Sequence, residues 1–206
     1  FIPDPWTQTN SDSSWWSRNL SSMISQAVND NSSGKLSLKS IIIILIAFLR
    51  FVRPKKYLRT ILLALTSIGK PWRKALFFDR LIHEINLRLI KSKKLDFNTV
   101  FFNSMAHIQH HYIFNSSAYN GNLKNPYWYI KDNFDPFFEG LLEFDDILFD
   151  YIHIEDYEYL IATGLTQNNY DKLDFYWRIK NHDQFIKYFG IKYKKVIHRM
   201  TRDFLI

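Results

Sequence analysis

The stretch from residue 98 to residue 115 constrains the fold most, because it joins a β-prone run to a histidine-rich segment. Residues 100–102 are Val-Phe-Phe and favour a short strand, after which Asn103 or Ser104 can cap a helix. Three histidines then follow at helical spacing, namely His107, His110 and His111. Their rings are expected on one helix face, and Asn103 lies one turn before the first of them. A strand that runs into a helix N-terminus is typical of a ligand site in an open α/β sheet.

Length and composition indicate one sizeable folded core. The chain has 206 residues, is 47% hydrophobic and contains no cysteine. Disulfides, thiolate nucleophiles and cysteine-bound zinc are therefore excluded, and any metal must be held by His, Asp, Glu or Asn. We expect a cytoplasmic protein.

Both ends of the sequence predict a fragment. The opening Phe-Ile-Pro-Asp-Pro-Trp has no initiator Met, no basic region and no apolar core of a signal peptide. The chain stops abruptly at Asp-Phe-Leu-Ile. We expect an N-terminally truncated piece of a longer polypeptide.

Charge is distributed unevenly along the chain. Residues 50–94 hold thirteen Lys/Arg and two acids, a net charge of +11, whereas the other residues hold fourteen against eighteen, a net charge of −4. This asymmetry favours an anionic partner such as phosphate, a lipid headgroup or nucleic acid. A solvated helical surface is the alternative.

Apolar periodicity predicts helices over about 13–28, 36–52, 55–68, 71–91 and 136–152. A further short helix is predicted over 184–189, with Asp183 as its cap and Gly190 as its end. The nine apolar residues 41–49 are too few to span a bilayer, which needs about 20 residues. They predict a buried helix, or alternatively an interfacial helix with snorkelling basic ends. In the 136–152 helix the acids are expected to form the solvated face and the apolar residues to face inward.

Later segments predict strands that alternate with these helices. Residues 157–164 resemble a buried parallel strand that ends in Thr-Gly, and residues 173–178 and 191–197 are further strand candidates. The predicted fold class is therefore α/β. The predicted organisation is a site loop and first helix over 1–34, a basic helical insert over 35–95 and an α/β core with the histidine cluster over 96–206.

Several segments taken together resemble a known family. They are Phe-Asn-Ser-Met-Ala-His-Ile-Gln-His-His-Tyr at 102–112, Ile-Ala-Thr-Gly-Leu-Thr-Gln at 161–167, Phe-Tyr-Trp-Arg at 175–178 with Asn181 and His182, and Pro-Asp-Pro-Trp at 3–6. Their order is similar to that in the alkaline-phosphatase-like superfamily, which includes type I phosphodiesterases and nucleotide pyrophosphatases, and within it to a divergent bacterial branch. The resemblance implies a three-layer α/β/α fold, here a partial domain with a helical insert.

The resemblance also implies a metal site. The superfamily binds two divalent metals, usually zinc, and its Ser or Thr nucleophile would lie upstream of this chain. Asn103 and His107 stand at the spacing of its Asp-x-x-x-His signature. The metal-ligand candidates are Asn103, His107, His110, His111 and His182, and the substrate-binding candidates are Asp4, Thr166, Gln167 and Arg178.

Two departures from the family pattern weaken a standard two-zinc site. Asn103 replaces an anionic Asp, and Gly164 and Leu165 stand where the family has an Asp-His pair. The leading hypothesis is a metal-dependent hydrolase of phosphoric or sulfuric esters with a small anionic substrate. One alternative is a non-catalytic or transferase-like relative that binds an anionic sugar or nucleotide. The other is peripheral membrane or nucleic-acid binding through the basic insert, although no nucleic-acid-binding motif is present.

Overall fold

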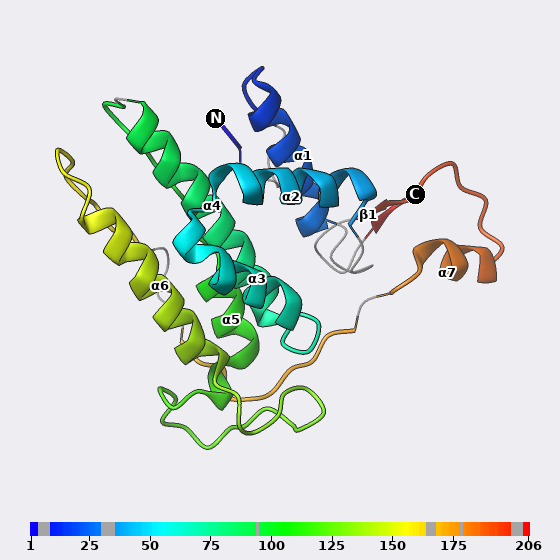
Figure 1. Cartoon of the computed structure of the whole chain (residues 1–206). Coiled ribbons are helices and arrows are strands. Elements are labelled where there is room, and N and C mark those ends of the chain that lie inside the picture. The colour runs from blue at the N-terminus through cyan, green and yellow to red at the C-terminus, as the bar shows by residue number, and fades with distance from the viewer. Residues whose placement is uncertain (4–8, 30–35, 94, 164–167, 178, 199–203) are drawn as a thin grey trace. The chain divides into compact units, whose positions relative to one another are not determined.

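A computed structural model describes residues 1–3, 9–29, 36–93, 95–163, 168–177, 179–198 and 204–206, and these are mostly helical (Figure 1). The α-helices are α1 (Trp15–Asn29), α2 (Leu38–Phe51), α3 (Tyr57–Thr66), α4 (Trp72–Ser92), α5 (Ser104–Tyr112), α6 (Pro136–Ile152) and α7 (His182–Tyr188). Short 3₁₀ helices are η2 (Pro54–Lys56) and η3 (Ile113–Asn115). Each helix that the periodicity predicts is confirmed, with ends shifted by a few residues.

The three-layer α/β/α prediction is wrong for the part of the chain that the structure describes. Its strands are β1 (Ile197–His198) and β2 (Phe204–Leu205), which pair antiparallel with Ile197 opposite Leu205. Residues 100–102, 157–163 and 173–177, which were predicted as strands, have no regular structure. β-Propensity did not decide these segments, because a strand forms only where another strand supplies its hydrogen bonds.

The chain divides into two compact units. One contains residues 1–49 and 175–206, and the other contains residues 50–174. We describe each by itself, and the predicted boundaries at residues 34 and 95 stay a prediction.

In the first unit, α1 and α2 meet partly through polar side chains. Gln26 of α1 accepts hydrogen bonds from the backbone N–H of Ser37 (3.1 Å) and from the hydroxyl of Ser40 (2.5 Å). Leu20 and Met23 of α1 are buried apolar residues of this unit. Six apolar residues of α2 are instead exposed, namely Leu38, Ile41, Ile42, Leu45, Ile46 and Leu49. The helix is confirmed, but the prediction that it is buried is wrong.

In the second unit, α4 packs against α3, α5 and α6 (Figure 1). The apolar core comprises Leu76, Leu81, Leu87, Ile108 and Ile147, all at most 2% exposed. At one end of α4, the Trp72 ring lies 5.5 Å from Tyr112 and 5.4 Å from Phe134 between ring centroids.

Local sequence signals fix the start of α6. Asp135 accepts a hydrogen bond from the backbone N–H of Phe138 (2.9 Å), and Pro136 occupies the first turn, as the Asp-Pro pair predicts. The second carboxylate oxygen of Asp135 accepts from the backbone N–H of Ser117 (2.9 Å), which ties the preceding loop to this helix end. Asp135 therefore anchors both the helix and the loop before it.

The orientation of α6 differs from the prediction, although Ile147 is buried and Asp145 is exposed as expected. Its acids Glu143 and Asp150 point into the unit, and Glu143 is buried. Apolar residues expected to face inward are exposed instead, namely Phe138, Leu141, Leu142 and Ile152. The physical reason is that η2, α3 and α4 present cations to α6, so that its inward-facing acids are paired and not left as uncompensated charges.

Candidate functional site

A layer of opposite charges lies between α6 and the elements η2, α3 and α4. We call it the charged layer. Its cations are Arg53, Lys56, Arg59, Arg73 and Arg80, and its acids are Glu84, Glu139, Glu143, Asp146 and Asp150. Four of these acids lie along one face of α6 at spacings of three and four residues, which matches the helical repeat.

Arg80 is the most enclosed member of the charged layer. Its side chain is 0% exposed, its Nε donates to Glu143, and its Nη2 lies 2.7 Å from Asp146 Oδ2. Arg59 donates from Nε to the other oxygen of Glu143 (2.8 Å). Lys56 donates to Asp146 (2.6 Å). The buried carboxylate of Glu143 is thus shared by two guanidinium groups.

Arg53 joins α4 to α6 at the other end of the charged layer. Its Nη2 donates to Glu84 Oε1 (2.6 Å) and its Nε to Glu84 Oε2 (2.8 Å). On α6, its Nη1 donates to Asp150 Oδ1 (2.8 Å), and its Nη2 donates to Asp150 Oδ2. All four oxygens of the two carboxylates therefore accept from one guanidinium, a bidentate geometry that lysine cannot supply.

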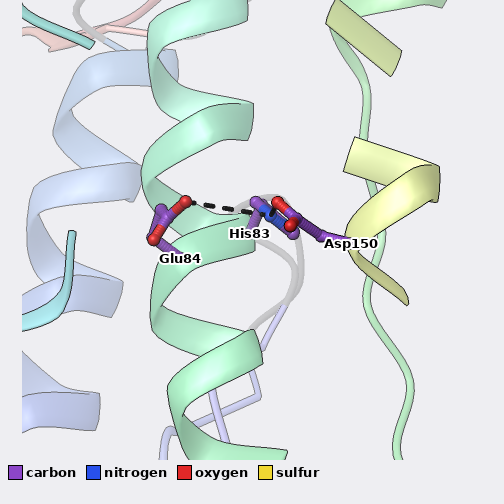
Figure 2. Close-up of side chains that lie close together, drawn as sticks. All are labelled: His83, Glu84 and Asp150. Atoms are coloured by element: carbon purple, nitrogen blue, oxygen red, sulfur yellow. Dashed lines mark hydrogen bonds and ion pairs between the residues drawn. The ribbon is translucent and has the colours of Figure 1, made fainter. Parts of the chain in front are cut away.

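His83, Glu84 and Asp150 form a group of potential metal-binding side chains, with their donor atoms within 4.8 Å of one another. Figure 2 shows His83 and Glu84 projecting from α4 and Asp150 approaching His83 from α6. His83 Nε2 is 3.1 Å from Asp150 Oδ2 and 3.4 Å from Arg53 Nη2. The donor set does not fit a dication while Arg53 is in place, because the guanidinium already occupies every carboxylate oxygen and supplies the positive charge.

Burial and neighbouring charges set the protonation states of Asp150 and His83. Burial alone raises the pKa of Asp150, but hydrogen bonds from Arg53 and His83 outweigh it and hold that pKa well below its usual range. Burial lowers the pKa of His83, against the opposing effect of Asp150. The imidazole is therefore neutral at pH 7, and with Asp150 ionised it is the Nε2–H that donates to the carboxylate.

The histidine-rich segment forms α5, and its rings lie partly together as predicted. The ring centroids of His107 and His111 are 4.6 Å apart, and His111 Nδ1 is 2.5 Å from the hydroxyl of Tyr129. His110 is exposed. Among the described residues, no group of three metal-binding side chains includes any of these histidines.

Asn103 precedes α5 and is exposed, and its side chain makes no capping hydrogen bond. The cap comes instead from α4, where the carboxylate of Asp79 accepts from the backbone N–H of Ser104 (2.9 Å). Burial raises the pKa of Asp79 to about 6, although the hydrogen bonds from Ser104 and Asn103 oppose this rise. The role of Asn103 as a metal ligand stays a prediction.

Of the remaining predicted site residues, one is described by the structure and four are not. His182 begins α7 in the other unit, is buried, and lies 4.6 Å from the Phe204 ring between centroids. Four predicted substrate contacts lie outside the described residues, namely Asp4, Thr166, Gln167 and Arg178. The predicted ester-hydrolase activity and its zinc ions stay predictions.

Sequence reasoning missed the charged layer, although one signal could have found it. The acids of α6 repeat every three or four residues, and the segment 50–94 carries the excess cations that would neutralise them. No local pattern marks His83, because its partners Asp150 and Arg53 are distant in sequence. Pairing the acidic stripe with the basic segment would have predicted an inward-facing acidic face.

Comparisons of the chain with protein-family models, with characterised proteins and with solved structures find no match.

Proposed function

We propose that this chain binds the surface of membranes that contain anionic lipid, through the apolar outer side of α3 in one unit and, separately, through that of α2 in the other. The observation that carries the proposal is the exposure of these sides. On α3 the outward residues are Leu58, Ile61, Leu62 and Leu65, with Ile68 just beyond the helix. Exposed apolar surface of this extent marks a contact with lipid or with another protein.

The polarity of α3 supports insertion of one side only. Thr60 and Leu63 face the interior of the unit, and Lys56 and Arg59 are paired with acids of α6. The opposite side, which includes Leu62 and Leu65, carries no charge. A helix with this division lies in the plane of the membrane interface, with its apolar side among the acyl chains.

The α2 helix also has one buried side and one exposed apolar side. Its buried residues include Ser40 and Ala47, whereas its isoleucines and leucines are mostly exposed, between exposed Lys39 and Arg50. Its 14 residues reach about 21 Å, which is shorter than the hydrocarbon core of about 30 Å. In the part of the chain that the structure describes, no helix has the length and hydropathy to cross a bilayer.

The positive charge of this region favours anionic lipid over an uncharged protein surface. Residues 31–78 contain ten Lys/Arg and no Asp or Glu. Five cations in residues 50–94 are neutralised in the charged layer, but exposed Arg50, in the last turn of α2, and exposed Lys55, just before α3, make no ion pair with a described residue. Cations beside an inserted helix contribute about 1 kcal/mol each at an anionic surface.

Vesicle flotation of the full chain tests the proposal. We expect binding to vesicles of phosphatidylcholine with 30% phosphatidylserine, weaker binding to pure phosphatidylcholine, and loss of binding as salt rises. The variant Leu62→Glu/Leu65→Glu places two charges on the inserted side and should reduce the partition coefficient by more than about tenfold.

The matched control is Leu160→Glu, because Leu160 is 92% exposed and lies outside any helix. Circular dichroism checks that each variant keeps its helices. Absence of binding at low salt would overturn the proposal. An equal loss in Leu160→Glu would also overturn it, since the binding would then reflect general hydrophobicity and not α3.

A further inference from the structure

The α6 helix has three distinct sides. One carries the acids of the charged layer, and a second packs on α5 through Gly140, where Met105 is the nearest side chain. The third side is exposed. We call it the outer face of α6, and its members are Phe138, Leu141, Leu142, Asp145, Phe149 and Ile152.

A single acid lies in the middle of this apolar face. Asp145 is exposed and makes no ion pair with any residue in the described ranges. At helical spacing it is flanked one turn earlier by Leu141 and Leu142, and one turn later by Phe149. Apolar turns on both sides of one charge form an interface pattern with a fixed register, as a single polar residue does in a coiled-coil seam.

Asp145 excludes lipid as the occupant of this face. Insertion of the face would remove a carboxylate from water without a cation to pair it, which costs several kcal/mol. The outer side of α3 carries no such acid, so the two surfaces differ in the partner that they fit.

Asp145 also disfavours a second copy of the chain. A two-fold pairing of α6 helices in antiparallel register about the middle of the face would bring Asp145 close to its own symmetry mate. The same residue would face itself in an in-register parallel pair. Like charges opposed in a desolvated seam oppose association, so charge complementarity requires a cation on the partner.

We propose that the outer face of α6 binds an amphipathic helix of another protein, in which one Lys or Arg lies between two apolar turns. The cation pairs with Asp145, and the apolar turns cover Leu142 and Phe149. This binding is independent of the membrane contact through α2 and α3.

Fluorescence anisotropy with synthetic helical peptides tests the inference on the full chain. Three labelled 21-residue peptides share one apolar stripe and differ only at its central position, which is Lys, Glu or Leu. We expect the Lys peptide to bind at least tenfold tighter than the Glu peptide. Asp145→Lys should reverse this preference, and Phe149→Glu should abolish binding of all three.

Leu62→Glu/Leu65→Glu is the control that separates the two surfaces, and it should leave peptide binding unchanged. The inference is overturned if no peptide binds, if the Lys and Glu peptides bind equally, or if Asp145→Lys keeps the original preference. Sedimentation equilibrium gives a further test, because self-association that Phe149→Glu removes would assign the face to a second copy of the chain.

Discussion

Removal of Arg80 tests the inward orientation of α6 most directly. The Arg80 side chain is 0% exposed and Glu143 is 3% exposed, so Arg80→Met leaves a buried carboxylate with one of its two cations. Breaking a buried ion pair by removing one partner costs about 3–5 kcal/mol. Arg59 still pairs with Glu143, and Lys56 still pairs with Asp146. We therefore expect the free energy of unfolding to fall by about 3 kcal/mol, the lower limit of this range.

Urea denaturation measures this loss as a lower midpoint at an unchanged slope. For a chain of this size, about 3 kcal/mol corresponds to a fall in melting temperature of about 6–12 °C. Arg88→Met is the matched control, because Arg88 lies on the same helix, is exposed and makes no ion pair with a described residue. It should change stability by less than about 0.5 kcal/mol.

A double-mutant cycle separates the pair from the side-chain volume. Arg80→Met combined with Glu143→Leu removes both charges, and its cost should be less than the sum of the single changes by about 1–3 kcal/mol. If Arg80→Met were as mild as Arg88→Met, Arg80 would be solvated. The charged layer, and with it the orientation of α6, would then be wrong.

Three further predictions concern separate sites. Asp79 keeps its proton in the native state up to pH about 6, whereas the unfolded chain loses it near its ordinary pKa of 3.8, so this group lowers stability as pH rises between these values. The stability of Asp79→Asn relative to wild type should therefore rise over that pH window in urea titrations, and a constant difference would contradict the raised pKa. For the metal-binding group, thermal melts with zinc should show little stabilisation of wild type through His83, Glu84 and Asp150 but a clear rise for Arg53→Ala. Adding His83→Ala should remove that rise, and its persistence would place zinc elsewhere. Finally, Asp135→Ala removes the cap of α6 and should cost about 1–2 kcal/mol in denaturant unfolding, with exposed Asp132→Ala as the control; equal costs would mean that the cap contributes nothing.

The histidine-rich segment shows which contacts local sequence spacing predicts and which it does not. Spacing alone predicted that His107 and His111 share a helix face, and their ring centroids are 4.6 Å apart. Spacing could not show that Tyr129 joins them from a later loop, or that Asp79 and not Asn103 caps α5. Those contacts depend on elements brought together by packing.

The sequence by itself determined which segments are helical, to within a few residues at each end, because the 3.6-residue repeat and a cap such as Asp135 with Pro136 act over a few residues. At α7 the cap is Asn181 and not Asp183. It did not determine which side of each helix is buried. The acidic stripe of α6 and the apolar stripe beside it are both amphipathic signals, and only the approach of Arg53 and Arg80 decided that the acids turn inward. Strand predictions failed for the same physical reason, since a strand depends on a distant partner, whereas a helix makes its hydrogen bonds within its own segment.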